Sequence, residues 1–219
     1  MTYEESLSYI HSIPKFVRPL GNKNLSVLLD RLGNPQNDLN FVHMAGTNGK
    51  GSTAAMLSEI LIRSGYKTGL YTSPYIEVFN ERIQINGENI SDSCLCALTE
   101  TVKSAMKQDA VSEFAFITAM AFLYFKQNDC DYVVLETGMG GRLDATNIIP
   151  PPKAAVLTSI SLDHMQYLGD TIEEIAHEKC GIIKNNCTVI SYPNHSVTDI
   201  IKNEAKKNNA RLIIAEEPD

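Results

Sequence analysis

The sequence predicts an α/β protein whose mostly parallel sheet is flanked by helices. Strand-like runs alternate with helix-like segments along nearly the whole chain, which is the pattern of βαβ units. The run at 131–135 is rich in β-branched residues, as in a parallel strand covered on both faces. A glycine-rich turn also joins the first predicted strand to its helix.

The predicted elements follow in chain order. Helices at 3–13 and 24–32 are separated by a turn-rich linker at 14–21. The first βαβ unit comprises a strand at 41–45, a helix that follows Lys50 and carries Ser52 in its first turn, and a strand at 67–72. Residues 79–87 predict a short hairpin that turns on Asn86-Gly87, or an excursion from the main sheet. The later elements are helices to about 107 and 127, which begin at Ser91 and Ser112, strands at 131–135, 154–160, 188–192 and 211–214, and helices at 171–183 and 196–208.

Composition limits the possible functions. The chain has 219 residues, 43% of them hydrophobic, and a net charge of −7, so we expect a buried core and no nucleic-acid partner. The longest apolar run, 114–125, is too short to cross a membrane and predicts a buried helix. Five cysteines without a C-x-x-C pair and a polar N-terminus predict free thiols, no secretion signal and a cytoplasmic location.

The turn after the first strand, Gly46-Thr47-Asn48-Gly49-Lys50-Gly51-Ser52, has the composition of a phosphate-binding loop. Glycines allow consecutive N–H groups to converge on an anion, and the following helix adds its N-terminal dipole. The spacing departs from G-x-x-x-x-G-K-[ST], because Gly46 stands three residues before Gly49 and Gly51 separates Lys50 from Ser52. An ordinary turn containing a lysine is the alternative, but the flanking strand and amphipathic helix favour nucleotide binding and a P-loop NTPase-like fold.

Four side chains that suit magnesium or phosphate stand near other predicted strand ends: Ser73, Glu136, His164 and Lys179. Glu136 follows a buried apolar strand, where a carboxylate is unfavourable unless it is paired or binds a cation. The others have ordinary alternatives, namely a turn cap for Ser73, a loop histidine bonded to Asp163 for His164 and a solvated helix lysine for Lys179. A carboxylate and a hydroxyl beside a triphosphate would suit Mg²⁺, which prefers oxygen ligands.

Four motifs in this order resemble the folylpolyglutamate synthase/dihydrofolate synthase family of the Mur ligase superfamily. They are AGTNGKGST at 45–53, TSP at 72–74 with FNERI at 79–83, ETG at 136–138 with GGRLDATN at 140–147, and DH at 163–164 followed by EKCGIIK at 178–184. The resemblance covers nearly the whole chain. It implies an ATP-dependent amide ligase of folate biosynthesis, with the fold of the Mur ligase central domain.

The resemblance also implies a reaction and its participants. In that family the carboxylate of dihydropteroate or a folate attacks the γ-phosphate of ATP with Mg²⁺ as cofactor, and the amino group of glutamate then displaces phosphate from the acyl phosphate. Catalysis of this kind depends on positioning and charge neutralisation.

Residue roles are carried over position by position. Residues Gly46 to Ser52 would hold the triphosphate, Ser73 and Glu136 one magnesium ion, and Glu136, His164 and a carbamylated Lys179 a second. Together with Lys50, the last three form the implied catalytic set. The implied contacts to the pterin-bearing substrate are Ser112, Phe114 and Asp144.

Members of that family carry a C-terminal domain that contributes to the ATP and glutamate sites. The resemblance therefore implies that residues 1–219 are the ATP-binding domain and that the C-terminal glutamate ligase domain is absent from this chain. The chain is then either a fragment or truncated product, or a partner supplies that domain in trans. We expect the chain to bind ATP weakly and to ligate poorly or not at all. Two other functions stay open: a P-loop kinase or NTPase of another family, and a non-catalytic nucleotide-binding fragment.

Overall fold

The structure is a computed structural model that describes residues 1–17 and 21–216. Residues 18–20 of the predicted linker, and residues 217–219, lie outside the described part. The α-helices of the described residues are α1 (Tyr3–Ser12), α2 (Lys23–Arg31), α3 (Lys50–Arg63), α4 (Asp92–Met106), α5 (Glu113–Gln127), α6 (Met165–Leu168), α7 (Ile172–Lys179) and α8 (Thr198–Lys207). Short 3₁₀ turns include η1 (Pro35–Asp38), η2 (Phe79–Arg82), η3 (Ala145–Ile148), η4 (Cys180–Ile182) and η5 (His195–Val197).

The strands form one sheet in the order β4-β3-β2-β5-β1-β6-β7-β8. They are β1 (Phe41–Ala45), β2 (Thr68–Tyr71), β3 (Ile83–Ile85), β4 (Glu88–Asn89), β5 (Tyr132–Glu136), β6 (Ala154–Leu157), β7 (Thr188–Ser191) and β8 (Arg211–Ile214). β2, β5, β1, β6, β7 and β8 run parallel, and β3 with β4 adds an antiparallel hairpin at one edge. The predicted fold class is therefore confirmed.

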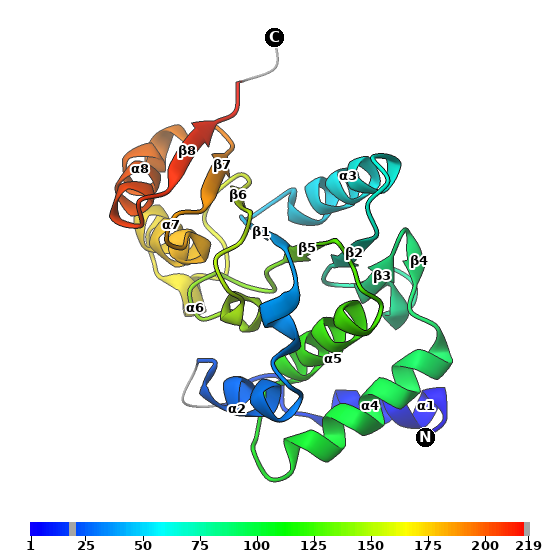
Figure 1. Ribbon diagram of the computed structural model, residues 1–219. Coiled ribbons are helices and arrows are strands. Elements are labelled where there is room, and N and C mark those ends of the chain that lie inside the picture. Colours follow the sequence, from blue (N-terminus) through cyan, green and yellow to red (C-terminus); the bar gives the residue numbers. More distant parts are fainter. Residues whose placement is uncertain (18–20, 217–219) are drawn as a thin grey trace.

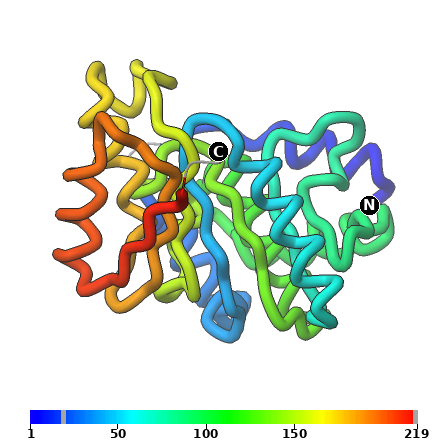
Figure 2. The backbone as a smooth tube through the Cα atoms, turned by 90° about the horizontal axis from the view of Figure 1, so that it is seen from above, coloured from blue at the N-terminus to red at the C-terminus, as the bar shows by residue number. Residues whose placement is uncertain are grey.

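Helices cover both faces of the central strands (Figure 1). On one face α3 packs on β1, β2 and β5 through a cluster of Met44, Ala54, Leu70 and Val134. On the other face lies α5, with α1, α2 and α4 outside it (Figure 1). Toward the other end of the sheet, α7 and α8 pack on β6 and β7, so that α8 lies far from α1 (Figure 2).

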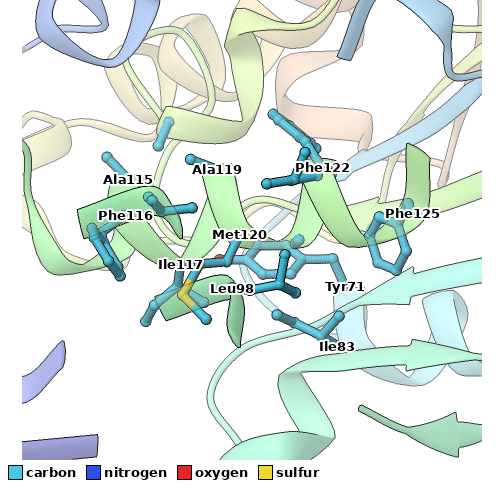
Figure 3. Close-up of a cluster of buried hydrophobic side chains, with 14 of the residues drawn as sticks. Tyr71, Ile83, Leu98, Ala115, Phe116, Ile117, Ala119, Met120, Phe122 and Phe125 are labelled. Atoms are coloured by element: carbon cyan, nitrogen blue, oxygen red, sulfur yellow. The ribbon is translucent and has the colours of Figure 1, made fainter. Parts of the chain in front are cut away.

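The helix α5 is the centre of the larger hydrophobic core. It is apolar on nearly every side because it packs on the sheet through one face and on α1, α2 and α4 through others. Phe116, Phe122 and Phe125 are fully buried, and Tyr71 of β2 packs beside the helix (Figure 3). This core fixes the N-terminal end of α5, which bears the predicted substrate residues.

Most predicted elements agree with the structure, and three differ. The hairpin predicted at 79–87 begins only at β3, because Phe79–Arg82 forms η2, where the Glu81 carboxylate accepts the N–H groups of Glu77 and Val78. The strand predicted at 154–160 ends at Leu157, because the chain beyond it bonds to the glycine-rich loop through Thr47 N–H to Ser159 O (2.7 Å). The helix predicted at 171–183 ends at Lys179 and continues as η4. Sequence patterns did not predict η1 or α6.

The loop after β5 and the end of α7 meet backbone to backbone. Arg142 N–H donates to Glu178 O at 2.8 Å. A Cβ added to Gly141 would lie 2.7 Å from the carbonyl oxygens of Glu178 and Lys179, and one added to Gly181 would lie 2.4 Å from Arg142 Cα. Only residues without a side chain permit this approach.

We expect Gly181→Ala to lower the free energy of unfolding by roughly 2–4 kcal/mol, because the methyl group meets backbone that has no room to move. Gly65→Ala is the matched control: its site is open but has φ +88°, so the expected loss is about 1 kcal/mol. Urea unfolding of both variants measures the difference. Equal losses would contradict the close approach.

Candidate active site

The glycine-rich loop lies between β1 and α3 and is bonded to the end of β6. Thr47 donates its N–H to Ser159 O at 2.7 Å and its hydroxyl to Ser161 O at 3.0 Å. A Cβ on Gly46 would lie 1.8 Å from Thr158 Oγ1, so only glycine allows this contact. The loop is therefore held in shape by its neighbour before any ligand binds.

The first turn of α3 opens onto a cavity of about 490 Å³. No side chain caps the helix at Gly49, which leaves its first N–H groups available to an anion. The Lys50 ammonium donates to Gly46 O (3.1 Å) and Thr47 O (3.3 Å). The cavity is lined by residues 47–52 together with Ser73, Glu81, Gln84 and Glu136. A hollow of about 580 Å³ between α8 and β8 lies away from these strand ends.

Glu136 ends β5 and lies beside the loop because Met44 pairs with it across the sheet. Its carboxylate is 3% exposed and accepts the Ser73 N–H at 3.0 Å. Burial raises the pKa of Glu136, while the Ser73 N–H and the Lys50 charge lower it. A Cβ on Gly51 would be 3.5 Å from Glu136 Oε2, so the carboxylate is adjacent to the first turn of α3.

Lys179 approaches the loop from the opposite side. It ends α7, is 2% exposed and donates to Gly46 O at 2.8 Å. Burial, with a smaller contribution from the charge of Lys50, lowers the pKa of Lys179 to about 8. The solvated helix lysine considered from the sequence is therefore the wrong alternative.

His164 stands apart from the other predicted metal ligands. It caps α6 in a left-handed conformation (φ +46°), its side chain is 51% exposed, and its Nε2 lies 3.7 Å from Asp163 Oδ1. It forms no hydrogen bond or ion pair with Glu136 or Lys179. In residues 1–17 and 21–216, no three His, Cys, Asp or Glu side chains gather into a metal site.

The predicted substrate residues gather at the N-terminus of α5. Ser112 caps the helix through Ala115 N–H (3.2 Å), and the Phe114 ring packs on Tyr71 with ring centres 5.7 Å apart. Phe114 also touches Gly138, where an added Cβ would lie 2.7 Å from the ring. Asp144, 8% exposed, accepts the Met139 N–H at 2.9 Å, so the three residues lie around one loop.

A buried chain of hydrogen bonds behind Asp144 was not predicted. The Thr146 hydroxyl is 2.5 Å from Asp144 Oδ1 and 2.8 Å from His43 Nε2. Burial raises the pKa of Asp144, and its hydrogen bonds oppose that shift. With Asp144 ionised, the one hydroxyl proton goes to the carboxylate, so His43 must donate from Nε2. Its Nδ1 is then a buried acceptor without a partner in the described residues.

We expect the neutrality of His43 to appear as acid sensitivity. Burial lowers the pKa of His43 from 6.5 to about 3. The unfolded chain takes up a proton near pH 6.5 and the folded chain does not, so His43 removes about 1.4 kcal/mol of stability per pH unit as the pH falls below 6.5. Unfolding of His43→Gln between pH 7 and 4 should show a smaller slope. His11→Gln, whose side chain is 47% exposed, is the control, and a wild-type slope in His43→Gln would contradict a neutral buried imidazole.

The sequence is similar to that of known ligases. A profile of the Mur ligase middle domain matches residues 44–217. Folylpolyglutamate synthase of Lacticaseibacillus casei is 44% identical over 198 residues, which cover 87% of this chain and 46% of that protein. Dihydrofolate synthase/folylpolyglutamate synthase of Bacillus subtilis is 43% identical over 216 residues, which cover 95% and 50%. The chain spans about half the length of the curated relatives it matches.

Solved structures of the same kind have this fold. A complex of FPGS with AMPPCP and folate matches with a TM-score of 0.95 and 39% identity, and the apo form of L. casei FPGS matches with 0.94 and 38%. Both alignments cover 98% of this chain and 54% of the other. The resemblance found in the four motifs is thus confirmed. The chain belongs to the Mur ligase middle-domain family.

Proposed function

We propose that the chain is the ATP-binding part of an amide ligase that joins glutamate to dihydropteroate or a folate. One observation carries the proposal: a buried carboxylate, Glu136, and a buried amine, Lys179, flank a phosphate loop from opposite sides. A simple nucleotide-binding turn would not need either group. The printed names of the relatives, which include folylpolyglutamate and dihydrofolate synthases, give the acceptor class.

In this proposal the loop and Lys50 hold the triphosphate, and the N-terminal end of α5 with Asp144 holds the pterin-bearing acceptor. The acceptor carboxylate attacks the γ-phosphorus, the bond to the β-phosphate oxygen breaks, and ADP leaves. The nitrogen of glutamate then attacks the acyl carbon, and inorganic phosphate leaves with the loss of a proton from nitrogen. The chain contributes positioning and fixed charge rather than covalent chemistry.

Magnesium fits the residues beside the loop. Glu136 is a buried carboxylate with one N–H donor, and a divalent cation would offset its burial. A Mg²⁺ ion, when bound, would neutralise charge on the β- and γ-phosphates and keep several waters. Glu136 and the Ser73 hydroxyl would hold one ion, and His164 would join a second site with Glu136 and Lys179.

Lys179 suits conversion to a carbamate. The neutral amine attacks the carbon of CO₂, a nitrogen–carbon bond forms, and a proton leaves, so a buried cation becomes an anionic oxygen ligand. The pKa of about 8 leaves a substantial neutral fraction of Lys179 near neutral pH. This modification would also remove the repulsion between Lys179 and Lys50.

The wider setting belongs to the same proposal. Residues 1–219 correspond to the ATP-binding domain, and the glutamate site would be completed by a C-terminal domain. The described residues contain no helix with the length and apolarity of a membrane span, and all five cysteines are free thiols. A cytoplasmic location suits free thiols.

We expect Mg-ATP to bind the chain weakly and Lys50→Ala to weaken that binding about 10–100-fold, because a charged partner of the phosphates is lost. Isothermal titration calorimetry measures the affinity of each variant for Mg-ATP. Lys67→Ala, at the far end of β2, is the control. Phosphate release in the presence of dihydropteroate and glutamate separates a ligase from a kinase or other NTPase. Equal affinity of Lys50→Ala and wild type would contradict the phosphate loop.

We expect ¹³CO₂ to give a carbamate signal in the ¹³C NMR spectrum of the chain. At fixed CO₂ pressure the signal should grow as the pH rises through about 8, because only the neutral amine of Lys179 reacts. Lys179→Met should abolish it. Lys184→Met is a matched control, since Lys184 is also buried with a pKa of about 8 but donates to Asn147 O (2.7 Å) and Ile149 O. A signal that follows Lys184 instead would contradict the assignment.

A further inference from the structure

Arg82 is a half-buried cation without an acidic partner. None of the hydrogen bonds or ion pairs within residues 1–17 and 21–216 involves its guanidinium, and its Nε is fully buried with no acceptor. Among the described residues, Arg31 pairs with Asp109 at 2.5 Å and Arg63 with Glu59 at 2.6 Å, whereas Arg211 lacks an ion pair but is exposed to solvent. An unpaired charge in such a position is unfavourable unless a ligand supplies the anion.

Aromatic rings hold this guanidinium in place. Its central carbon lies 5.3 Å from the ring centre of Tyr75 and 5.6 Å from that of Phe79. The backbone is fixed as well, because Arg82 O accepts the Thr72 N–H at 3.1 Å and β3 begins at the next residue. A guanidinium on two aromatic faces is positioned before a ligand arrives, so little side-chain entropy is lost on binding.

Its position is between the metal ligands and the acceptor residues. Phe79 packs edge-on against His11, which bonds to Glu113 in the first turn of α5 at 2.7 Å. On the other side, Arg82 O accepts the N–H of Thr72, which precedes the predicted metal ligand Ser73, and Tyr71 of the same strand packs on Phe114. Arg82 is therefore connected through Phe79 to the N-terminal end of α5 and through Thr72 to the segment that bears Ser73.

The anion that would pair with Arg82 is not the triphosphate. The cavity over the phosphate loop is lined by Glu81 and Gln84, the neighbours of Arg82 in the chain, but not by Arg82 itself. Lys50, Gly49 and the first turn of α3 already supply positive charge there. A planar fork of donors matches a carboxylate, which it can bind through two parallel hydrogen bonds.

We propose that Arg82 forms a carboxylate subsite that binds and orients the reacting carboxylate of the acceptor. The inference rests on the proposed function, because it takes the acceptor to lie at the N-terminus of α5. In this arrangement the guanidinium fork binds both carboxylate oxygens in its plane, and a remaining lone pair of one oxygen attacks the γ-phosphorus. The residue thereby selects acceptors that carry a carboxylate.

The test compares pteroate with its neutral carboxamide by calorimetric titration of the chain. We expect wild type to prefer pteroate about tenfold. Arg82→Gln should bring the two affinities within about twofold of each other, and Arg82→Lys should retain part of the preference, because it keeps the charge and loses the fork. Arg63→Gln is the control, since its exposed guanidinium pairs only with Glu59. Thermal unfolding checks that each variant is folded. If Arg82→Gln does not fold, the preference of Arg82→Lys for pteroate over the carboxamide tests the proposal.

Each outcome decides between the proposals. A full carboxylate preference in folded Arg82→Gln or Arg82→Lys overturns the subsite while leaving the proposed function intact. Wild type that binds neither pteroate nor the amide overturns the acceptor site and the subsite with it. Free glutamate is titrated as a separate arm: binding that depends on Arg82, with an unchanged preference for pteroate, overturns the assignment to the acceptor.

Discussion

The central position of β1 in the sheet is the constraint on which the site depends. Because β1 lies between β5 and β6, its C-terminal loop has a neighbouring strand end on each side. The β5 side brings Glu136 to the first turn of α3, and the β6 side supplies the backbone groups that hold Thr47. Ligands of α/β proteins bind at this edge because parallel strands deliver their loops to it. A different strand order would separate the same residues.

The loop after β5 extends this constraint to the second half of the molecule. It runs from Glu136 past Gly138, which touches Phe114, to Gly141, which touches the end of α7. Lys179 reaches the carbonyl of Gly46 only because the two backbones meet at this point. The residues predicted to contact phosphate, metal and acceptor are therefore linked through one segment, residues 136–144. A change of packing at Gly181 would therefore shift the positions of both Lys179 and Asp144.

Much of the fold was predictable because its signals are local. The apolar run of β5, the caps at Ser91 and Ser112 and the Asn86-Gly87 turn each specify an element without reference to the rest. The glycine-rich loop between β1 and α3 was predictable for the same reason, while its role in phosphate binding stays a prediction. The motifs around Glu136 and Lys179 added the family. The buried polar contacts that hold these residues in place were not predictable. His43 reads as one polar residue in an apolar strand, and its bond to Thr146 spans 103 positions. In the sequence Arg82 has the pattern of an ordinary surface charge. Only the structure shows that its guanidinium lacks an acidic partner and lies over two aromatic rings.

The bonds of Lys50 also affect how a nucleotide enters the site. In the structure its ammonium donates to Gly46 O and Thr47 O, two carbonyls of the loop that it serves. A triphosphate must displace the amine from both before it gains the charge, so the exchange replaces existing contacts rather than adding new ones. A triphosphate bound there would therefore gain less from Lys50 than from a lysine without partners. The same two carbonyls give the lysine a defined position in the absence of a ligand.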